Sequence, residues 1–221
     1  MTESYIVPFG EGEAEYVEKR SRFIGHVWPV DSEEEARRRI EETRKRHYDA
    51  RHNCWCYVLR EGNVMRYSDD GEPQGTAGQP MLNVFVREEV TNVCCVVTRY
   101  FGGILLGAGG LTRAYGGTAK LALNEAGISR MRLWATLAIP CAYSQYERVK
   151  LETEGFGGVI AEADYGADIA LTVLLPEERA DAFLAHILDV TAGTVEGMVC
   201  GERFQDVPWR PPVRGEGGPH G

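Results

Sequence analysis

The residues best suited to chemistry lie in the segment VVTRYFGGILLGAGGLTRAYGGTAK, residues 96–120. The pattern predicts a buried strand, a glycine-rich loop and a helix from about residue 109 to residue 126. Glycine lets the main chain turn sharply and approach a ligand, and the free N–H groups at a helix start favour an anion. The segment therefore predicts a phosphate-binding loop, with glycines at Gly102, Gly103, Gly107, Gly109 and Gly110.

The same segment carries cations and aromatic residues of a kind often exposed at binding surfaces. They are Arg99, Arg113, Lys120, Tyr100, Phe101 and Tyr115. The loop matches neither the P-loop nor the dinucleotide-binding pattern. An alternative is that the glycines serve tight turns and close helix–sheet packing, and the glycines alone do not decide between the two. The cations would bind phosphate and the aromatic rings would stack on bases, which favours a binding surface.

A second candidate is the carboxylate cluster in Ser68-Asp69-Asp70-Gly71-Glu72-Pro73. Three carboxylates this close can bind Mg²⁺ or polarise a water molecule. The spacing is not that of an EF-hand. A solvent-facing turn held by hydrogen bonds from Asp side chains is the alternative, and the turn chemistry of the segment favours it. We expect no cofactor, and Asp69, Asp70 and Glu72 are the ligands to examine if a metal binds.

A third candidate is His52-Asn53-Cys54-Trp55-Cys56. Its His and Cys residues suit Zn²⁺ or a cysteine nucleophile assisted by His52. No second Cys or His pair with zinc-finger spacing lies nearby, so a half-buried strand with reduced thiols is the favoured interpretation. The six cysteines, Cys54, Cys56, Cys94, Cys95, Cys141 and Cys200, lack the spacing of a secreted disulfide framework.

Composition and charge limit the classes of protein. The 221 residues are 43% hydrophobic and 26% charged, as in a globular protein. No apolar run approaches the roughly 18 residues of a membrane span, and the acidic N-terminus lacks the apolar core of a signal peptide. We therefore expect a cytoplasmic protein with no membrane partner. Residues 141–221 hold 6 Lys and Arg against 14 Asp and Glu, which disfavours contact with nucleic acid there.

The order of elements predicts two domains. Ser32 and Glu35 form a capping box for a helix whose cations nearly all have an acidic partner one turn away. Residues 81–86 fit either a helix beginning near Pro80 or a strand. Beyond residue 132 the pattern predicts a β-α-β-β-α-β order, which is the ferredoxin-like arrangement, with Ser144 and Glu147 as a second capping box. The predicted domains are 1–132 and 133–207, followed by a disordered tail at 208–221.

Four segments together resemble the YigZ/IMPACT family. They are RSRFIGHV at 20–27, ARHNCWCY at 50–57, YSDDGEPQGTAGQPML at 67–82 and VVTRYFGGILLGAGGLTRAYGG at 96–117. The resemblance covers most of residues 15–127 in the same order. It implies an α+β protein whose N-terminal domain is like the second domain of a small-subunit ribosomal protein. It also implies a C-terminal domain like one in elongation factor G.

The resemblance also supplies candidate functional residues, without a proven role for each. They are Arg22, His52, Asn53, Asp69, Asp70, Glu72, Arg99, Gly102, Gly103, Gly109, Gly110, Arg113 and Tyr115. The resemblance implies that eukaryotic IMPACT, similar to the N-terminal part, regulates translation under amino-acid starvation by competing for a kinase activator. We expect no counterpart of its extra partner-binding domain in this sequence. The fold alone does not decide function.

Two hypotheses follow. In the first, a cytoplasmic regulatory protein linked to translation binds RNA, the ribosome, a translation factor or another phosphate-bearing partner through the glycine-rich loop. In the second, a hydrolase or phosphotransferase, with or without Mg²⁺, acts on a small phosphorylated or peptide-like substrate. His52, Asp69, Asp70 and Glu72 would then be the catalytic residues. The sequence does not give the oligomeric state, and a scaffold built on the acidic C-terminal domain is a further alternative.

Overall fold

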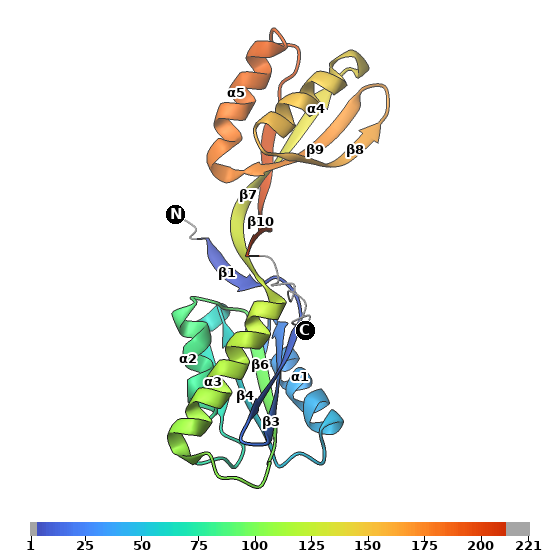
Figure 1. The fold of residues 1–221 in the computed structure, drawn as a ribbon. Coiled ribbons are helices and arrows are strands. Elements are labelled where there is room, and N and C mark those ends of the chain that lie inside the picture. Colours follow the sequence, from blue (N-terminus) through green and yellow to red (C-terminus); the bar gives the residue numbers. More distant parts are fainter. Residues whose placement is uncertain (1–3, 211–221) are drawn as a thin grey trace, which may run out of the picture. The chain divides into compact units, whose positions relative to one another are not determined.

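The computed structural model describes residues 4–210, which form an α+β architecture with two five-stranded sheets (Figure 1). The described residues divide into two compact units, of which one holds Tyr5–Arg130 and the other Met131–Asp206. This division lies close to the boundary predicted at residue 132. The predicted tail at 208–221 falls mostly outside the described residues, and strand β10 (Met198–Arg210) reaches its first positions.

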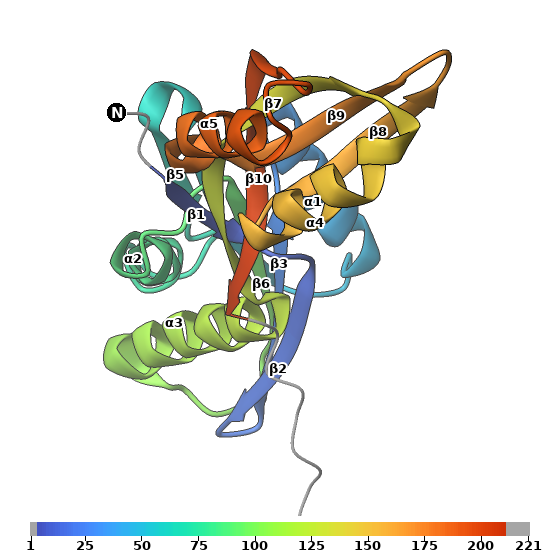
Figure 2. The same ribbon diagram turned by 90° about the horizontal axis from the view of Figure 1, so that it is seen from above.

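The N-terminal unit is a sheet with helices on both faces. Its strands follow the order β2-β3-β6-β4-β5, and every neighbouring pair is antiparallel. Helices α2 and α3 cover one face and α1 covers the other (Figures 1 and 2). The elements are β1 (Tyr5–Pro8), β2 (Gly12–Glu18), β3 (Ser21–Pro29), α1 (Glu33–Arg46), β4 (His52–Leu59), β5 (Val64–Ser68), α2 (Gly78–Arg87), β6 (Val93–Tyr100) and α3 (Gly107–Ala126).

The ambiguous segment at residues 81–86 is a helix. Pro80 lies in the first turn of α2, where its missing N–H group leaves no hydrogen bond unmade. Met81, Leu82 and Phe85 point into the core, and this spacing of three and four residues is typical of a buried helix face. The short strand β1 was not predicted from the sequence.

Helix α3 packs closely on the sheet because two strand positions lack a side chain. A Cβ atom at Gly12 would lie 2.2 Å from the Ala122 carbonyl oxygen, and one at Gly25 would lie 2.8 Å from Thr118 Cγ2. Tyr115 and Leu123 fill the space between this helix and the sheet. Helix α3 also packs against α2, with Gly116 next to Pro80.

Helix α1 is the charged surface helix that the sequence predicts. The Ser32 Oγ accepts a hydrogen bond from the Glu35 N–H group at 3.2 Å, which confirms Ser32 as the N-cap residue. The Glu35 side chain accepts from the N–H group of Asp31, one residue before the position that a capping box requires. Arg37 pairs with Glu33 one turn away, whereas Arg39 reaches Glu11 on another segment. Beneath the helix, His26 is 5% exposed and its ring stacks on Trp28.

The C-terminal unit has the predicted β-α-β-β-α-β order. Its strands pair in the order β8-β9-β7, and β10 pairs with the other side of β7, which also pairs with β1. The second capping box is wrong: α4 begins at Tyr146, and its N-cap residue Gln145 makes no side-chain cap. The elements are β7 (Ile128–Cys141), α4 (Tyr146–Gly155), β8 (Val159–Tyr165), β9 (Ile169–Pro176), α5 (Ala180–Val190) and β10.

The thiols are all free, and five of the six are buried, as the sequence predicts. Burial raises the pKa of Cys54, Cys56 and Cys94 above the usual value for a thiol. Within residues 4–210, no helix combines the length and the apolar character needed to span a membrane.

Two glycine substitutions test the packing of α3. A Cβ atom at Gly117 would meet no atom within 4 Å, so Gly117→Ala removes a helix-destabilising residue without a clash. We expect it to raise the free energy of unfolding by about 0.5–1 kcal/mol. Gly12→Ala, the matched variant, should lower it, because the new methyl group meets the backbone of α3. Chemical denaturation monitored by circular dichroism measures both, and a stable Gly12→Ala protein would contradict the packing described.

Two histidines of the N-terminal unit, the buried His26 and the half-buried His47, predict acid sensitivity. Burial lowers the pKa of both His26 and His47, so below about pH 6.5 the unfolded chain binds more protons at these rings than the folded chain. Stability should therefore be complete above that pH and fall as the pH drops from 7 to 5. Urea midpoints across this range measure the effect. The double variant His26→Gln/His47→Gln should show a shallower pH dependence, and an unchanged one would refute the assignment.

Candidate functional site

A buried ion pair lies at the centre of the N-terminal unit. Arg99, near the end of β6, is directly opposite Phe23 on β3 and His52 on β4, so the three side chains share one face of the sheet. The Arg99 Nη1 donates to Glu72 Oε1 at 2.7 Å, and the two side chains are only 7% and 4% exposed. The Tyr115 hydroxyl of α3 donates to the same oxygen at 2.7 Å. This triad joins the loop after β5, the strand β6 and the helix α3.

The triad corrects the surface roles expected of two residues. Arg99 is 6% exposed and Tyr115 is fully buried, so neither can bind a phosphate group or stack on a base at the surface. Burial, followed by the influence of Cys54 and Glu72, raises the pKa of the Tyr115 hydroxyl, which keeps it a hydrogen-bond donor. Arg99 and Tyr115 instead stabilise the N-terminal unit from its interior, through their hydrogen bonds to Glu72.

Asp69 caps helix α2 from a distance. Its Oδ1 accepts from the N–H groups of Ala77 at 3.0 Å and Gly78 at 2.8 Å, while its Oδ2 accepts from Gly75 at 2.8 Å. The helix has no cap from its own N-cap residue, so this carboxylate satisfies donors that would otherwise be unpaired. Its negative charge also lies at the positive end of the helix dipole.

Asp70 fixes the turn that follows β5. Its φ of +43° lies in the left-handed region, and three contacts hold it there. Its Oδ1 accepts from Arg44 Nη2 at 2.8 Å, and its Oδ2 accepts from the Asn53 N–H group at 2.7 Å. Its carbonyl oxygen lies 2.8 Å from His52 Nδ1, which must donate because a carbonyl only accepts. His52 therefore contacts the main chain of Asp70 and not its carboxylate.

The carboxylate cluster is engaged by donors of the protein itself. Each of Asp69, Asp70 and Glu72 accepts at least two internal hydrogen bonds. Among residues 4–210, no group of three or more His, Cys, Asp or Glu side chains is arranged to hold a metal ion. The nearby Cys54 is fully buried, with its Sγ donating to the Asp69 carbonyl oxygen at 3.0 Å. These hydrogen bonds give the three carboxylates a structural role in the turn after β5.

Other predicted residues are also engaged within the fold. Asn53 is 6% exposed and its Oδ1 accepts from Thr98 Oγ1 at 2.7 Å. Arg22 pairs with Glu15 at 2.7 Å, and Lys120 pairs with Glu88. Gly102 serves close packing, because a Cβ atom there would lie 2.0 Å from the Arg20 carbonyl carbon.

The rest of the glycine-rich loop and the start of α3 are exposed. Gly103 has a φ of +85° and open space around it, so it supplies a turn that other residues rarely adopt. Gly109 and Gly110 lie in the first turn of α3, which has no side-chain cap. A Cβ atom at Gly109 would contact only Arg113 Nη1, at 3.6 Å. The N–H groups of this turn therefore remain available for an anion.

A groove between α2 and α3 adjoins this exposed surface. It encloses about 390 Å³ and is lined by Gly75, Gln79, Pro80, Asn83, Val84, Arg87, Thr112, Arg113, Gly116 and Gly117. We call it the α2–α3 groove. Arg87 and Arg113 are exposed, and neither makes an ion pair or side-chain hydrogen bond with any residue that the structure describes. Both guanidinium groups are therefore free to bind an anion.

Arg113 and the start of α3 were predicted from the sequence as binding residues, whereas the contribution of α2 to the groove was not. Gln79, Asn83 and Arg87 lie on one side of that helix, at a spacing of four residues. A signal for this was present: Arg87 and Arg113 have no acidic residue three or four positions away, unlike Arg37 on α1. Cations without local partners are the ones free for a ligand.

The fold and the comparisons with known proteins define the class. Two α+β units, of which the second has ferredoxin-like order, match the Impact N-terminal domain at residues 19–123 and a domain of unknown function (DUF1949) at residues 139–194. A crystal structure of a hypothetical protein is similar to the chain, with a TM-score of 0.58 and 34% sequence identity. It covers 91% of this chain, which in turn covers 99% of it.

Two bacterial relatives are similar over most of the chain. IMPACT family member YvyE of Bacillus subtilis is 37% identical over 87% of this chain and 89% of its own length. IMPACT family member YigZ of Escherichia coli is 36% identical over 88% of this chain and 97% of its own length. The chain belongs to the IMPACT family. The analogies with a ribosomal protein and with elongation factor G stay predictions.

The buried triad predicts the effect of removing one charge. Glu72→Gln leaves the Arg99 charge unpaired in the interior, and we expect a loss of about 3–5 kcal/mol in the free energy of unfolding. Denaturant unfolding measures it. The double variant Glu72→Gln/Arg99→Met removes both charges and should recover part of that loss. A double variant less stable than the single one would contradict the account of the pair.

Proposed function

We propose that this protein is a binding protein linked to translation that engages a phosphate-bearing partner, an RNA alone or within the ribosome. The proposed surface is the α2–α3 groove together with the exposed start of α3. One observation carries the proposal: Arg87 and Arg113, from two different helices, line the same groove and lack acidic partners in the described chain. By contrast, Arg37, Arg38, Arg39 and Arg44 of α1 each pair with a carboxylate.

The groove has the chemistry that phosphate recognition requires. A guanidinium group donates two parallel hydrogen bonds to phosphate oxygens, and its charge is permanent. The uncapped N–H groups at the start of α3, that of Gly109 among them, add donors and the positive end of a helix dipole. Thr112 and Asn83 supply neutral polar groups in the same lining. Gly117 leaves room for a ligand to approach the backbone of α3, because a Cβ atom there would meet no atom within 4 Å.

The loop before α3 adds an apolar contact surface. Phe101 is 49% exposed, and Ile104 and Leu105 are 42% and 82% exposed. An exposed aromatic ring stacks on a nucleic-acid base, so Phe101 takes the role that the sequence suggested for Tyr115. Apolar side chains exposed beside a cationic groove support an interaction surface rather than a solvated turn.

The link to translation comes from the family. The N-terminal unit is similar to eukaryotic proteins named Protein IMPACT. Its resemblance to them supports a role in the regulation of translation. Residues 1–140 carry a net charge of −1, compared with −8 for residues 141–221. Binding to RNA would therefore be local to the N-terminal unit and sensitive to salt.

Fluorescence anisotropy with a labelled single-stranded RNA tests the proposal. Arg87→Ala/Arg113→Ala should weaken binding by about tenfold or more at low salt and reduce its salt dependence, because two phosphate contacts disappear. Gly117→Glu adds a negative charge at a position of the groove where a Cβ atom would meet no atom within 4 Å, and it should act in the same direction. Arg37→Ala/Arg38→Ala removes equal charge from α1 and serves as the control.

Two results would refute this function. One is the absence of RNA or ribosome binding by the wild-type chain even at low salt. The other is an equal loss of affinity in the α1 control and in the Arg87→Ala/Arg113→Ala variant, which would show a general charge effect without a site.

A further inference from the structure

One face of the C-terminal sheet carries no helix. Successive side chains of a strand point to opposite faces, and the inward set is Leu137 and Ile139 on β7 and Leu171 and Val173 on β9. These pack with Val149 of α4 and with Phe183 and Ile187 of α5, so both helices lie on this side. The alternate residues therefore face away from the helices. We call their surface the open sheet face.

The open sheet face is hollowed and has a floor of small residues. The hollow encloses about 550 Å³. Ala138 and Pro140 of β7 and Ala170 and Thr172 of β9 alternate with the core residues and line it. Met198 at the start of β10 also lines it and is 66% exposed. A flexible Met beside small side chains makes an apolar surface that adapts to different contact shapes.

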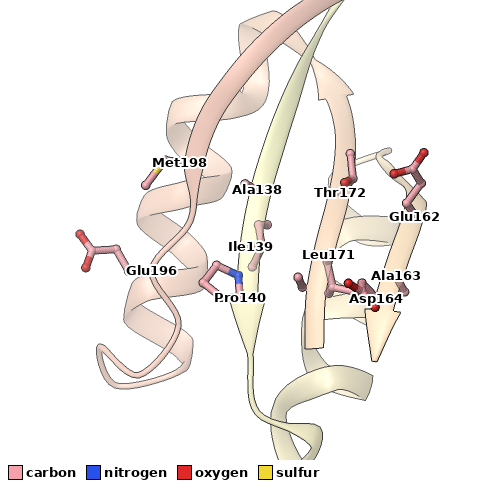
Figure 3. A pocket seen from close by; sticks show the side chains of 11 residues that line it. Ala138, Ile139, Pro140, Glu162, Ala163, Asp164, Leu171, Thr172, Glu196 and Met198 are labelled. Atoms are coloured by element: carbon pink, nitrogen blue, oxygen red, sulfur yellow. The ribbon is translucent and has the colours of Figure 1, made fainter. Parts of the chain in front are cut away.

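Carboxylates lie on both sides of this floor. Figure 3 shows Glu162 and Asp164 of β8 to one side and Glu196 to the other, with Ala138 and Pro140 between them. All three carboxylates are exposed, and none has an ion pair or hydrogen bond with the described residues. The lining contains no Lys, Arg or His. The surface is therefore negatively charged and uncompensated.

We propose that the open sheet face docks a basic polypeptide segment of a partner protein. Arg or Lys side chains of the segment would pair with Glu162, Asp164 and Glu196. The aliphatic stems of those side chains would lie on the floor around Ala138 and Ala170. Charge complementarity identifies this occupant, because phosphate groups of RNA would be repelled by the same carboxylates. The inference concerns a different unit from the RNA surface proposed above and stands without it.

The test uses the full chain and a fluorescein-labelled peptide of repeating Arg-Leu-Gly, with repeating Glu-Leu-Gly as the negative probe. Anisotropy at physiological salt should show binding of the basic peptide only. Glu162→Gln/Asp164→Asn/Glu196→Gln should weaken it by about tenfold. Ala170→Trp, which fills the hollow but keeps the charges, should weaken it as well. Glu147→Gln/Glu154→Gln/Glu178→Gln removes equal charge from exposed positions elsewhere in the unit and should leave binding unchanged.

Three results would overturn the inference. Equal losses in the two triple variants would show that the peptide senses only the net charge. Unchanged affinity of the Ala170→Trp variant for the peptide would show that the peptide does not bind in the hollow. A dimer in sedimentation velocity that Ala170→Trp converts to a monomer would make a second copy of this chain the occupant. RNA binding does not enter these outcomes, so failure of the RNA surface and failure of this one are distinguishable.

Discussion

The buried pair between Arg99 and Glu72 is the interaction on which the N-terminal unit depends. A charge in the interior is tolerated only when a partner and hydrogen bonds compensate its lost hydration. Here Glu72 also accepts from Tyr115, so one carboxylate holds the central strand β6, the loop after β5 and the helix α3 in register. Glu72 lies in that loop. A shift of the loop would therefore leave the Arg99 charge in the interior without its ionic partner.

This constraint positions the surface that we assign to ligand binding. Asp69 and Asp70, next to Glu72, cap α2 and fix the turn against β4 and α1. The start of α2 and the start of α3 are thereby held on the same side of the sheet. The hydrogen bonds of these carboxylates fix the helices that form the groove. The guanidinium groups of Arg87 and Arg113 and the first N–H groups of α3 remain exposed on its surface. The carboxylates of the loop after β5 thus stabilise the fold, while the exposed arginines of α2 and α3 line the groove that we assign to ligand binding.

The sequence predicted the elements better than the roles of their side chains. The βαββαβ order, the capped helix α1 and the reduced, buried thiols follow from local patterns, and the structure confirms them. The burial of Arg99 and Tyr115 does not follow, because their partner Glu72 is distant in sequence from both. The cap on α2 was missed for the same reason, since Asp69 lies eight residues before the Ala77 N–H group that it binds. Local propensity cannot supply contacts that the fold alone brings together.

We infer that a phosphate-bearing partner binds where α2 and α3 meet. A titration of the ¹⁵N-labelled full chain with a short single-stranded RNA, monitored by amide chemical shifts, would locate the binding surface. We expect the largest shifts at Gly107–Gly110, Arg113 and Gly117 on α3 and at Gln79–Arg87 on α2, with little change around α1. Shifts confined to other surfaces, or no shifts at saturating RNA and low salt, would contradict the account.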